Sequence, residues 1–404
     1  MKLCVYRIGD ICKIKSGKRL PAGYDFSVDP TEYRYIRSRD IKAGKISLEE
    51  VAYIDEETKK KINKYIINEG DIAITIVANI GDIGYATQEC DGINLTENAV
   101  RLTEFDNNVA FSKYLAYYLC QPSMKSYMEN LAAGAAQAKL GIYKIEKMKV
   151  QLPEIGVQKA VVEIVDKYDH LIEVNNKRIK VLEQMAENLY KEWFVRFRFP
   201  GHESAEFLDG IPKGWEYLTI ESLSDVLQRG ISPDYDGDGN FTVISQKCIR
   251  QNIMDIKEAR RQNKAFKPEL NLQDGDTVIC STGTGTLGRV GQVYGEYHGT
   301  TFDSHVTLVR SNASIGKHFL FWTLKEMQPW FMNMGIGSTN QQELYRSTIK
   351  NAKALTPGRN IVEIFENVVE PIHSEIIRLM NAVDNLTKQR DLLLPRLMSG
   401  KLEV

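Results

Sequence analysis

Residues 155–193 decide the fold, and they read IGVQKAVVEIVDKYDHLIEVNNKRIKVLEQMAENLYKEW. The stretch contains no proline, and its apolar side chains recur at the three- and four-residue spacing of one helical face. Pro153 stands just before it, where proline favours the start of a helix. At 1.5 Å per residue, such a stretch predicts a helical rod of up to about 60 Å.

The same apolar pattern returns 204 residues later in the chain. Pro153 has its counterpart in Pro357, again directly before the helical stretch. A long chain with two such stretches is an internal repeat. Eight apolar positions of the first stretch match eight apolar positions of the second: Val157, Val161, Ile164, Tyr168, Ile172, Ile179, Leu182 and Leu189 against Ile361, Phe365, Val368, Ile372, Ile376, Val383, Leu386 and Leu393.

The segments upstream of the two helices correspond as well. Residues 69–71 (EGD) and 274–276 (DGD) each open a β-branched run, which a glycine turn and a further short strand follow. Strands bounded by Gly and Asp turns predict a mixed α/β (α+β) module in each half. The predicted order is a module at 1–152, a helix at 153–197, a linker at 198–214, a module at 215–356 and a helix at 357–404.

An apolar stripe this long must be buried, and the two helices are the natural partners for each other. The alternative is two ordinary core helices inside separate domains. Within the first helix we expect a coiled-coil seam that polar residues interrupt at Asn175 and Arg178. The expected seam positions are Tyr168, Leu171, Asn175, Arg178, Leu182, Met185 and Leu189.

Composition restricts the function classes. The net charge of −1 argues against a uniformly basic nucleic-acid coat, so any DNA-binding charge must be local. The six cysteines include no C-x-x-C pair, which favours reduced thiols in a cytoplasmic protein and predicts no zinc site. The first ten residues lack the apolar core of a signal peptide, and no apolar run reaches the length of a membrane span.

Several short motifs resemble nucleotide- or calcium-binding sites, but the residues around them do not fit such a site. Residues 283–288 (GTGTLG) match the dinucleotide pattern G-x-G-x-x-G, but the residues that follow predict a strand, so a tight turn is the better interpretation. Residues 234–239 begin like a calcium loop, yet the twelfth position is Ser245 instead of Glu, which favours a plain loop. The six histidines show no metal-ligand spacing, and no ATP-binding P-loop is present. The sequence therefore predicts no catalytic residue and no metal site.

Positive charge gathers locally in both modules. Residues 257–267 hold five Lys and Arg against Glu258, and the first module has cations around Lys18 and Arg37. Each cluster alone is also explained by a solvated face. Two unlike modules on a rigid spacer suit DNA, because half-sites recur along its axis at fixed separations. The modules differ strongly in sequence, which predicts an asymmetric, split target.

Three further stretches carry a family resemblance: residues 189–197 (LYKEWFVRF), 210–215 (GIPKGW) and 389–402 (QRDLLLPRLMSGKL). With the order module, helix, module, helix, the chain resembles the specificity subunit of type I restriction–modification enzymes. The resemblance implies two target-recognition domains separated by an antiparallel pair of helices with a pseudo-two-fold repeat. It implies double-stranded DNA, two copies of a methyltransferase subunit and a restriction/translocase subunit as partners. S-adenosylmethionine and ATP with Mg²⁺ would bind those partners only, and this chain would be non-catalytic.

Matching the modules to this resemblance places the expected DNA contacts on loops. They are Ser16, Lys18, Arg19, Arg37, Arg39, Gln137, Lys139, Arg229, Ser232, Gln246, Lys247, Arg250, Ser338, Thr339, Asn340 and Gln341. The helices would bind the partner subunits through Asn176, Arg178, Lys388 and Arg390. Two other functions stay open at this point. One is a DNA methyltransferase or nuclease with a divergent site, and the other is a coiled-coil scaffold.

Overall fold

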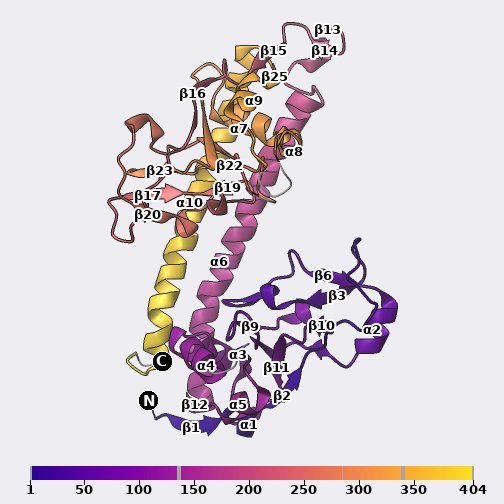
Figure 1. The fold of residues 1–404 in the computed structure, drawn as a ribbon, viewed down its shortest axis with the longest axis vertical. Helices are drawn as coiled ribbons and strands as arrows, with labels where there is room; N and C mark the ends of the chain where they lie inside the picture. The colour runs from indigo at the N-terminus through magenta and orange to yellow at the C-terminus, as the bar shows by residue number, and fades with distance from the viewer. Residues whose placement is uncertain (1, 134–137, 284, 338–341, 403–404) are drawn as a thin grey trace. The chain divides into compact units, whose positions relative to one another are not determined.

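The computed structural model describes residues 2–133, 138–283, 285–337 and 342–402. It divides the chain into two compact units, residues 1–171 with 385–404 (unit 1) and residues 172–384 (unit 2). Each unit combines β-sheets with a segment of each of two long helices, α6 (Ile155–Tyr190) and α10 (Arg359–Met398) (Figure 1). A short π-helical turn, Lys191–Val195, continues α6.

Unit 1 is built on a sheet of six described strands, in the order β2-β11-β8-β9-β5-β4. Beside it lies a sheet in the order β6-β3-β10-β7, and β1 pairs with β12 as an antiparallel ribbon. The strand bounds are β1 (Cys4–Arg7), β2 (Lys13–Ser16), β3 (Tyr33–Ile36), β4 (Ile41–Lys42), β5 (Gly44–Ile46), β6 (Ala52–Ile54), β7 (Ile66–Ile67), β8 (Ile72–Thr75), β9 (Ile83–Tyr85), β10 (Ile93–Leu95), β11 (Ala99–Thr103) and β12 (Lys149–Leu152). The helices are α1 (Ile8–Ile11), α2 (Glu56–Ile62), α3 (Ser112–Leu119), α4 (Pro122–Ala132) and α5 (Ile142–Lys147).

Unit 2 repeats this topology. Its larger sheet has the order β16-β24-β21-β22-β19-β18, its smaller sheet the order β20-β17-β23, and β15 pairs with β25 as β1 does with β12. The strands are β15 (Glu216–Thr219), β16 (Ser224–Arg229), β17 (Phe241–Ile244), β18 (Ile249–Arg250), β19 (Ile253–Met254), β20 (Arg260–Gln262), β21 (Thr277–Cys280), β22 (Val290–Gln292), β23 (Thr300–Phe302), β24 (Val306–Ser311) and β25 (Lys353–Thr356). The helices are α7 (Lys317–Glu326), α8 (Gln328–Asn333) and α9 (Arg346–Asn351), and a hairpin of β13 (Phe207–Leu208) and β14 (Ile211–Pro212) precedes β15. The predicted internal repeat of mixed α/β modules is confirmed.

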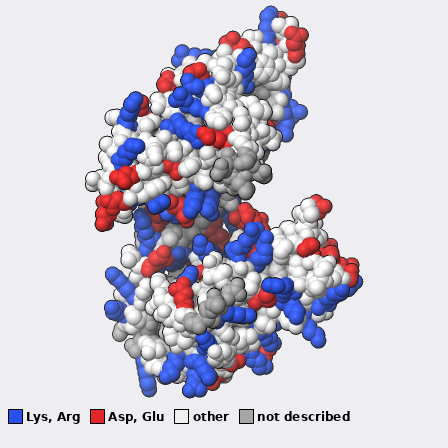
Figure 2. Space-filling model, in the orientation of Figure 1, with Lys and Arg blue, Asp and Glu red and all other residues white. Residues whose placement is uncertain are grey.

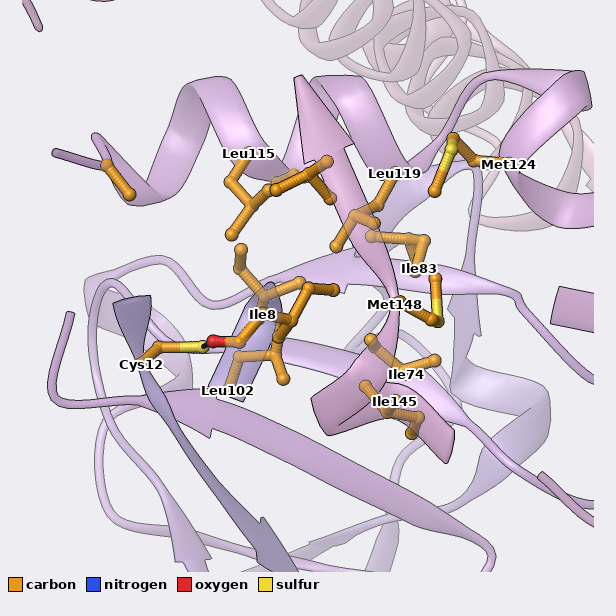
Figure 3. Close-up of a cluster of buried hydrophobic side chains, with 14 of the residues drawn as sticks. Ile8, Cys12, Ile74, Ile83, Leu102, Leu115, Leu119, Met124, Ile145 and Met148 are labelled. Atoms are coloured by element: carbon orange, nitrogen blue, oxygen red, sulfur yellow. Dashed lines mark hydrogen bonds between the residues drawn. The ribbon is translucent and has the colours of Figure 1, made fainter. Parts of the chain in front are cut away.

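The core of unit 1 lies between the larger sheet and its helices. Ile74 and Leu102 from the sheet meet Leu115 and Leu119 of α3 (Figure 3). Val161 of α6 belongs to the same buried cluster, so the module is joined to the long helix by apolar packing. Burying one such side chain contributes about 1.5–3 kcal/mol, so the module and its helix segment fold as one unit.

The two long helices pack against each other in antiparallel fashion. In unit 2, Ile179 of α6 belongs to one buried cluster with Ile376 and Leu379 of α10, while the later residue Tyr190 packs against the earlier residue Phe365. In unit 1, residues near the start of α6 share a cluster with the last residues of α10. The expected pairing of the helices is confirmed, and the alternative of two helices in separate cores is wrong.

The expected seam of α6 is wrong by one residue at several positions. Leu171 and Met185 are 48% and 52% exposed, and Arg178 is exposed as well. The buried positions instead step by seven through Val165, Ile172, Ile179 and Ala186 to Trp193. Apolar residues occur on both sides of this seam, so the spacing of three and four fits either stripe and only the partner helix selects one. In α10, Val368 of the repeated pattern is likewise 44% exposed.

A buried histidine pair joins the unit 2 module to α10. His318 at the start of α7 is 1% exposed and pairs with Glu370 at 3.0 Å, and His373 is 2% exposed and pairs with Asp274 at 2.8 Å. The two imidazole centroids lie 4.8 Å apart. Lys317 bridges the two carboxylates. Burial, with the neighbouring His373 as the next cause, lowers the pKa of His318 to about 4.

This lowered pKa predicts acid sensitivity of unit 2. The unfolded chain takes up the proton near pH 6.5 and the folded chain only near pH 4, so stability falls as the pH drops through that window. The full effect is about 3 kcal/mol. Glu366, whose pKa burial raises to about 7, acts in the opposite direction. Urea unfolding at pH 7 and pH 4.5 should therefore be compared between the wild type and His318→Gln, because the contribution of Glu366 cancels. An equal loss of stability in both proteins would contradict the assignment.

Candidate nucleic-acid interface

Four strand-connecting loops and the approach to α5 meet at one end of the sheets in unit 1. The amides of Gly17 and Lys18 donate to the carbonyls of Ala99 and Leu95, and the amide of Thr96 donates to Ile36. On the other side, the amide of Ile76 donates to Asn98, and Leu140 donates to Ile76. We call the residues that these bonds hold together the loop cluster of unit 1. It consists of residues 16–19, 37–39, 76–77, 96–98 and 138–140.

Unit 2 repeats these bonds one by one. Gly230 and Ile231 donate to Val306 and Phe302, and Asp303 donates to Ile244. Ser281 donates to His305, and Leu344 donates to Ser281. The loop cluster of unit 2 consists of residues 229–232, 245–247, 281–282, 303–305 and 342–344.

The shared bonds define which positions correspond, and the side chains at these positions differ. An isolated β-bridge pairs Val77 with Lys139 in unit 1, and the matching bridge pairs Thr282 with Glu343 in unit 2. The same backbone therefore presents different chemistry in the two halves. Five pairs show this: Ser16 and Arg229, Ser38 and Gln246, Val77 and Thr282, Asn98 and His305, Lys139 and Glu343.

The predicted DNA contacts of unit 1 that the structure describes lie on its loop cluster. Lys18 is exposed and its Nζ lies 5.6 Å from the ring centroid of Tyr65. Arg19 pairs with Glu97 at 2.8 Å, and Arg37 with Asp40 at 3.1 Å. Ser16, Arg39 and Lys139 are exposed on the same cluster, and Gln137 lies outside the described residues.

Most of the unit 2 predictions also fall on its loop cluster. Arg229 donates to the Ser304 carbonyl at 2.6 Å and pairs with Glu343. Gln246 lies beside Thr282, Lys247 is exposed, and the Ser232 carbonyl accepts a bond from Lys264. Arg250 stands apart on the edge strand β18, where it donates to the Lys247 carbonyl at 3.2 Å. Ser338, Thr339, Asn340 and Gln341 lie outside the described residues.

The polar residues of the loop clusters that the sequence prediction missed include Asn98, Thr282, His305 and Glu343. His305 Nδ1 lies 2.7 Å from the Thr282 hydroxyl, and Glu343 binds Arg229. Thr282, His305 and Glu343 lie in separate stretches of the sequence, and only strand and loop pairing brings them together. One signal was available, since His305 follows directly on the Asp303–Ser304 turn between two β-branched runs.

The basic run 257–267 is less positive in space than in sequence. Tyr235 pairs with Gln262 of β20, and Asp236 donates its amide to the carbonyl of Arg261. The acidic loop with Asp234, Asp236 and Asp238 therefore borders the run. Basic and acidic side chains also alternate over the face drawn in Figure 2. Acidic residues that are distant in the sequence therefore partly neutralise the positive charge of this run.

Arg178 and Arg390, which were predicted to bind partner subunits, form ion pairs between the two long helices. Arg178 pairs with Glu375 of α10 at 3.0 Å, and Arg390 of α10 pairs with Asp169 of α6 at 2.7 Å. Each ion pair lies inside one unit and joins the two helices there. Asn176 and Lys388 are exposed. In each unit, an ion pair thus adds to the apolar packing between the two helices.

The structure also bears on the glycine motif, the cysteines and the possibility of a metal site. Residues 283–288 connect β21 to β22, so a strand follows the glycine motif, as predicted for a turn. All six cysteines are free, and burial raises the pKa of the Cys12 thiol to about 12. Within the described ranges, no group of three His, Cys, Asp or Glu side chains has a geometry that could hold a metal ion. Among the same residues, no helix is long and apolar enough to cross a membrane.

Comparison with known proteins assigns a class to this fold. A family model described as the type I restriction modification DNA specificity domain matches residues 2–184 and 212–382, one copy in each half. The chain belongs to this family, the specificity subunits of type I restriction–modification systems, which recognise target DNA.

Individual relatives agree with this assignment. The MjaIX type I restriction enzyme specificity subunit of Methanocaldococcus jannaschii is 25% identical over 87% of this chain and 82% of its own length. The HindI specificity subunit of Haemophilus influenzae is 21% identical over 98% of this chain and 99% of its own. A crystal structure of the type I restriction–modification S subunit from M. genitalium shares the fold, with a TM-score of 0.57 at 15% identity, over 98% of this chain and 96% of that one.

Proposed function

We propose that this specificity subunit reads a bipartite, asymmetric DNA target, with one half-site for each loop cluster. The observation that carries the proposal is the repeated hydrogen-bond scaffold with different side chains at its corresponding positions. A shared scaffold would approach DNA in the same way in both halves, while unlike side chains would select unlike bases. The alternative functions, a lone methyltransferase or nuclease or a coiled-coil scaffold, offer no account of this arrangement.

The side chains of the loop clusters suit both parts of DNA recognition. Exposed cations such as Lys18 would bind phosphates and position the protein, while Arg39 and Lys247, on the loop clusters, would donate to base edges. Arg229 and Gln246 belong to the residue types that make bidentate bonds to guanine and adenine. The modest net charge fits a protein that binds DNA as part of a complex rather than through a broad basic surface.

We further propose that the chain recruits the catalytic subunits and supplies no catalytic group itself. Two modules of one topology, each with a segment of both helices, offer a pair of quasi-equivalent surfaces, which favours two copies of one methyltransferase subunit. Asn176, Arg178, Lys388 and Arg390 would lie at these contacts, with Arg178 and Arg390 acting through the helix pairing that they stabilise. A restriction subunit would complete the assembly. S-adenosylmethionine and ATP with Mg²⁺ would bind to the partner subunits.

Two independent readers predict a half-site-specific phenotype. Replacing both Lys247 and Arg250 by Ala should lower methylation about tenfold through the half-site read by unit 2, because exposed cations near that loop cluster are removed. Preference in the other half-site should stay intact. The measurement is methylation of a randomised duplex by the chain with its methyltransferase partner, read base by base.

Arg39→Ala is the matched control, since Arg39 occupies in unit 1 the position that Lys247 occupies in unit 2. It should reduce methylation through the opposite half-site. An equal loss in both half-sites from either variant would contradict two independent readers. A salt titration separates the scaffold alternative, because DNA binding through phosphates weakens steeply as salt rises. Turnover by the purified chain alone would favour the enzyme alternative.

A further inference from the structure

Three side chains in the loop cluster of unit 2 form a polar chain. The Thr282 hydroxyl lies 2.7 Å from Nδ1 of His305 and 3.4 Å from Oε1 of Gln246, to which it donates. A hydroxyl has one proton to donate, and Thr282 uses it on Gln246. The tautomer that satisfies both contacts is the one in which Nδ1 of His305 donates to Thr282, and in this tautomer Nε2 is a hydrogen-bond acceptor.

The backbone around His305 is fixed, so the direction of this acceptor is well defined. The His305 amide donates to the carboxylate of Asp303 at 2.9 Å, and the His305 carbonyl accepts the amide of Ser281 at 2.8 Å. Asp303 is itself 3% exposed, so its bond lies in a dry environment. The imidazole, in contrast, is exposed. An exposed ring on a rigid, hydrogen-bonded turn can select one partner group without a large loss of entropy.

We propose that His305, oriented by Thr282, reads a base edge that carries an exocyclic amino group, the N6 amino group of adenine or the N4 amino group of cytosine. Such groups are the hydrogen-bond donors of the major groove, and they match an imidazole acceptor. The inference rests on the proposed function and makes it specific for one residue. Position 98 of unit 1 corresponds to His305, and its Asn98 can both donate and accept, so the two halves would read different edges there.

Base-by-base methylation of a randomised duplex, with the chain in its methyltransferase complex, tests the assignment. In His305→Ala, the preference for the natural base over the other bases should fall about tenfold at one base pair of the half-site read by unit 2. Base preference in the other half-site should stay unchanged. Asn98→Ala, the matched variant, should have its effect in the opposite half-site. At the affected base pair, replacing adenine by purine, or cytosine by pyrimidin-2-one, removes the amino group from the major-groove edge. The wild type should bind this duplex about tenfold more weakly, whereas His305→Ala should bind both duplexes equally.

Three outcomes would overturn the inference. The first is that His305→Ala keeps the base preference of the wild type, which itself discriminates bases in both half-sites. This result would refute the role of His305 and leave the proposed function intact. Another is a wild type that does not distinguish the analogue from the natural base, which refutes the acceptor role. The third is a wild type with no base preference at all, and this result would remove the proposed function together with the inference. Thr282→Val, which cannot orient the ring through a hydroxyl, should reproduce part of the loss, and Thr282→Ser should restore it.

Discussion

Substituting Gly230 by Ala should abolish reading of one half-site. A Cβ at this position would lie 2.2 Å from the carbonyl oxygen of Phe302 and 2.3 Å from that of Asp303, both backbone atoms. The end of β16 must then move away from the turn that carries His305, and the loop cluster of unit 2 loses its shape. Overpacking of this kind costs about 1–3 kcal/mol, and if the full cost falls on the DNA-binding conformation of these loops, the affinity drops by up to about a hundredfold. The measurement is methylation of the proposed bipartite target, read separately for its two proposed half-sites.

Gly17→Ala should have the same effect in the other half-site, since its Cβ would lie 2.0 Å from the carbonyl oxygen of Thr96. Gly237→Ala is the control within unit 2, because no heavy atom lies within 4 Å of the added Cβ. This control should leave both half-sites intact. Normal methylation by Gly230→Ala would show that the close approach of these loops is not needed for recognition.

Replacing Asp276 by Asn should destabilise unit 2 more than any exposed charge change. Asp276 is 2% exposed, and its two oxygens each lie 2.7 Å from a guanidinium nitrogen of Arg310. Without the carboxylate, the charge of Arg310 stays in the sheet uncompensated, a change that costs about 3–5 kcal/mol when a buried pair is broken. Chemical denaturation at pH 7, with hydrogen exchange to locate the effect, measures the loss. Unit 1 has a similar buried pair, Asp71 with Arg101 at 2.7 Å, in which the aspartate but not the arginine occupies the corresponding position.

Glu56→Gln provides the contrast. Glu56 pairs with Lys60 at 2.8 Å on the surface of α2, where both side chains are exposed. Screening by water makes such pairs contribute little, so the midpoint of denaturation should barely change. The structural role of the pair would be refuted if the strands around Asp276 were equally protected from hydrogen exchange in Asp276→Asn and in the wild type.

The helices and the duplication could be predicted because their signals are local and repeated. The apolar residues of 155–193 recur at helical spacing, and the same phase returns at 361 and beyond. The flanking glycine and aspartate turns marked the strands, for instance at Gly70–Asp71 and Gly275–Asp276. The choice of seam could not be predicted, since Leu171 and Ile172 are both apolar and only the position of α10 selects Ile172.

The residues of the proposed recognition surface could be suggested only in part from the sequence. Lys18 and Arg37 follow strands and Arg229 ends one, and cations at such places suggest DNA contacts, which stay a prediction. Sequence alone offered no way to see that Thr282, His305 and Glu343 lie together, because strand register and loop pairing bring them into contact. The same holds for the acidic loop beside residues 257–267, which changes the charge of that region.

The sequence by itself determined that this protein consists of two mixed α/β modules, each followed by a long helix. The spacing of apolar residues is a local property of the chain, so it can be read without knowledge of the tertiary structure. Tertiary structure alone decided which residues meet. Asp169 and Arg390 are 221 positions apart and form one ion pair, and Asn98 and His305 become equivalent through identical backbone bonds. Contacts across strands and between helices depend on register and topology, which short-range patterns do not specify.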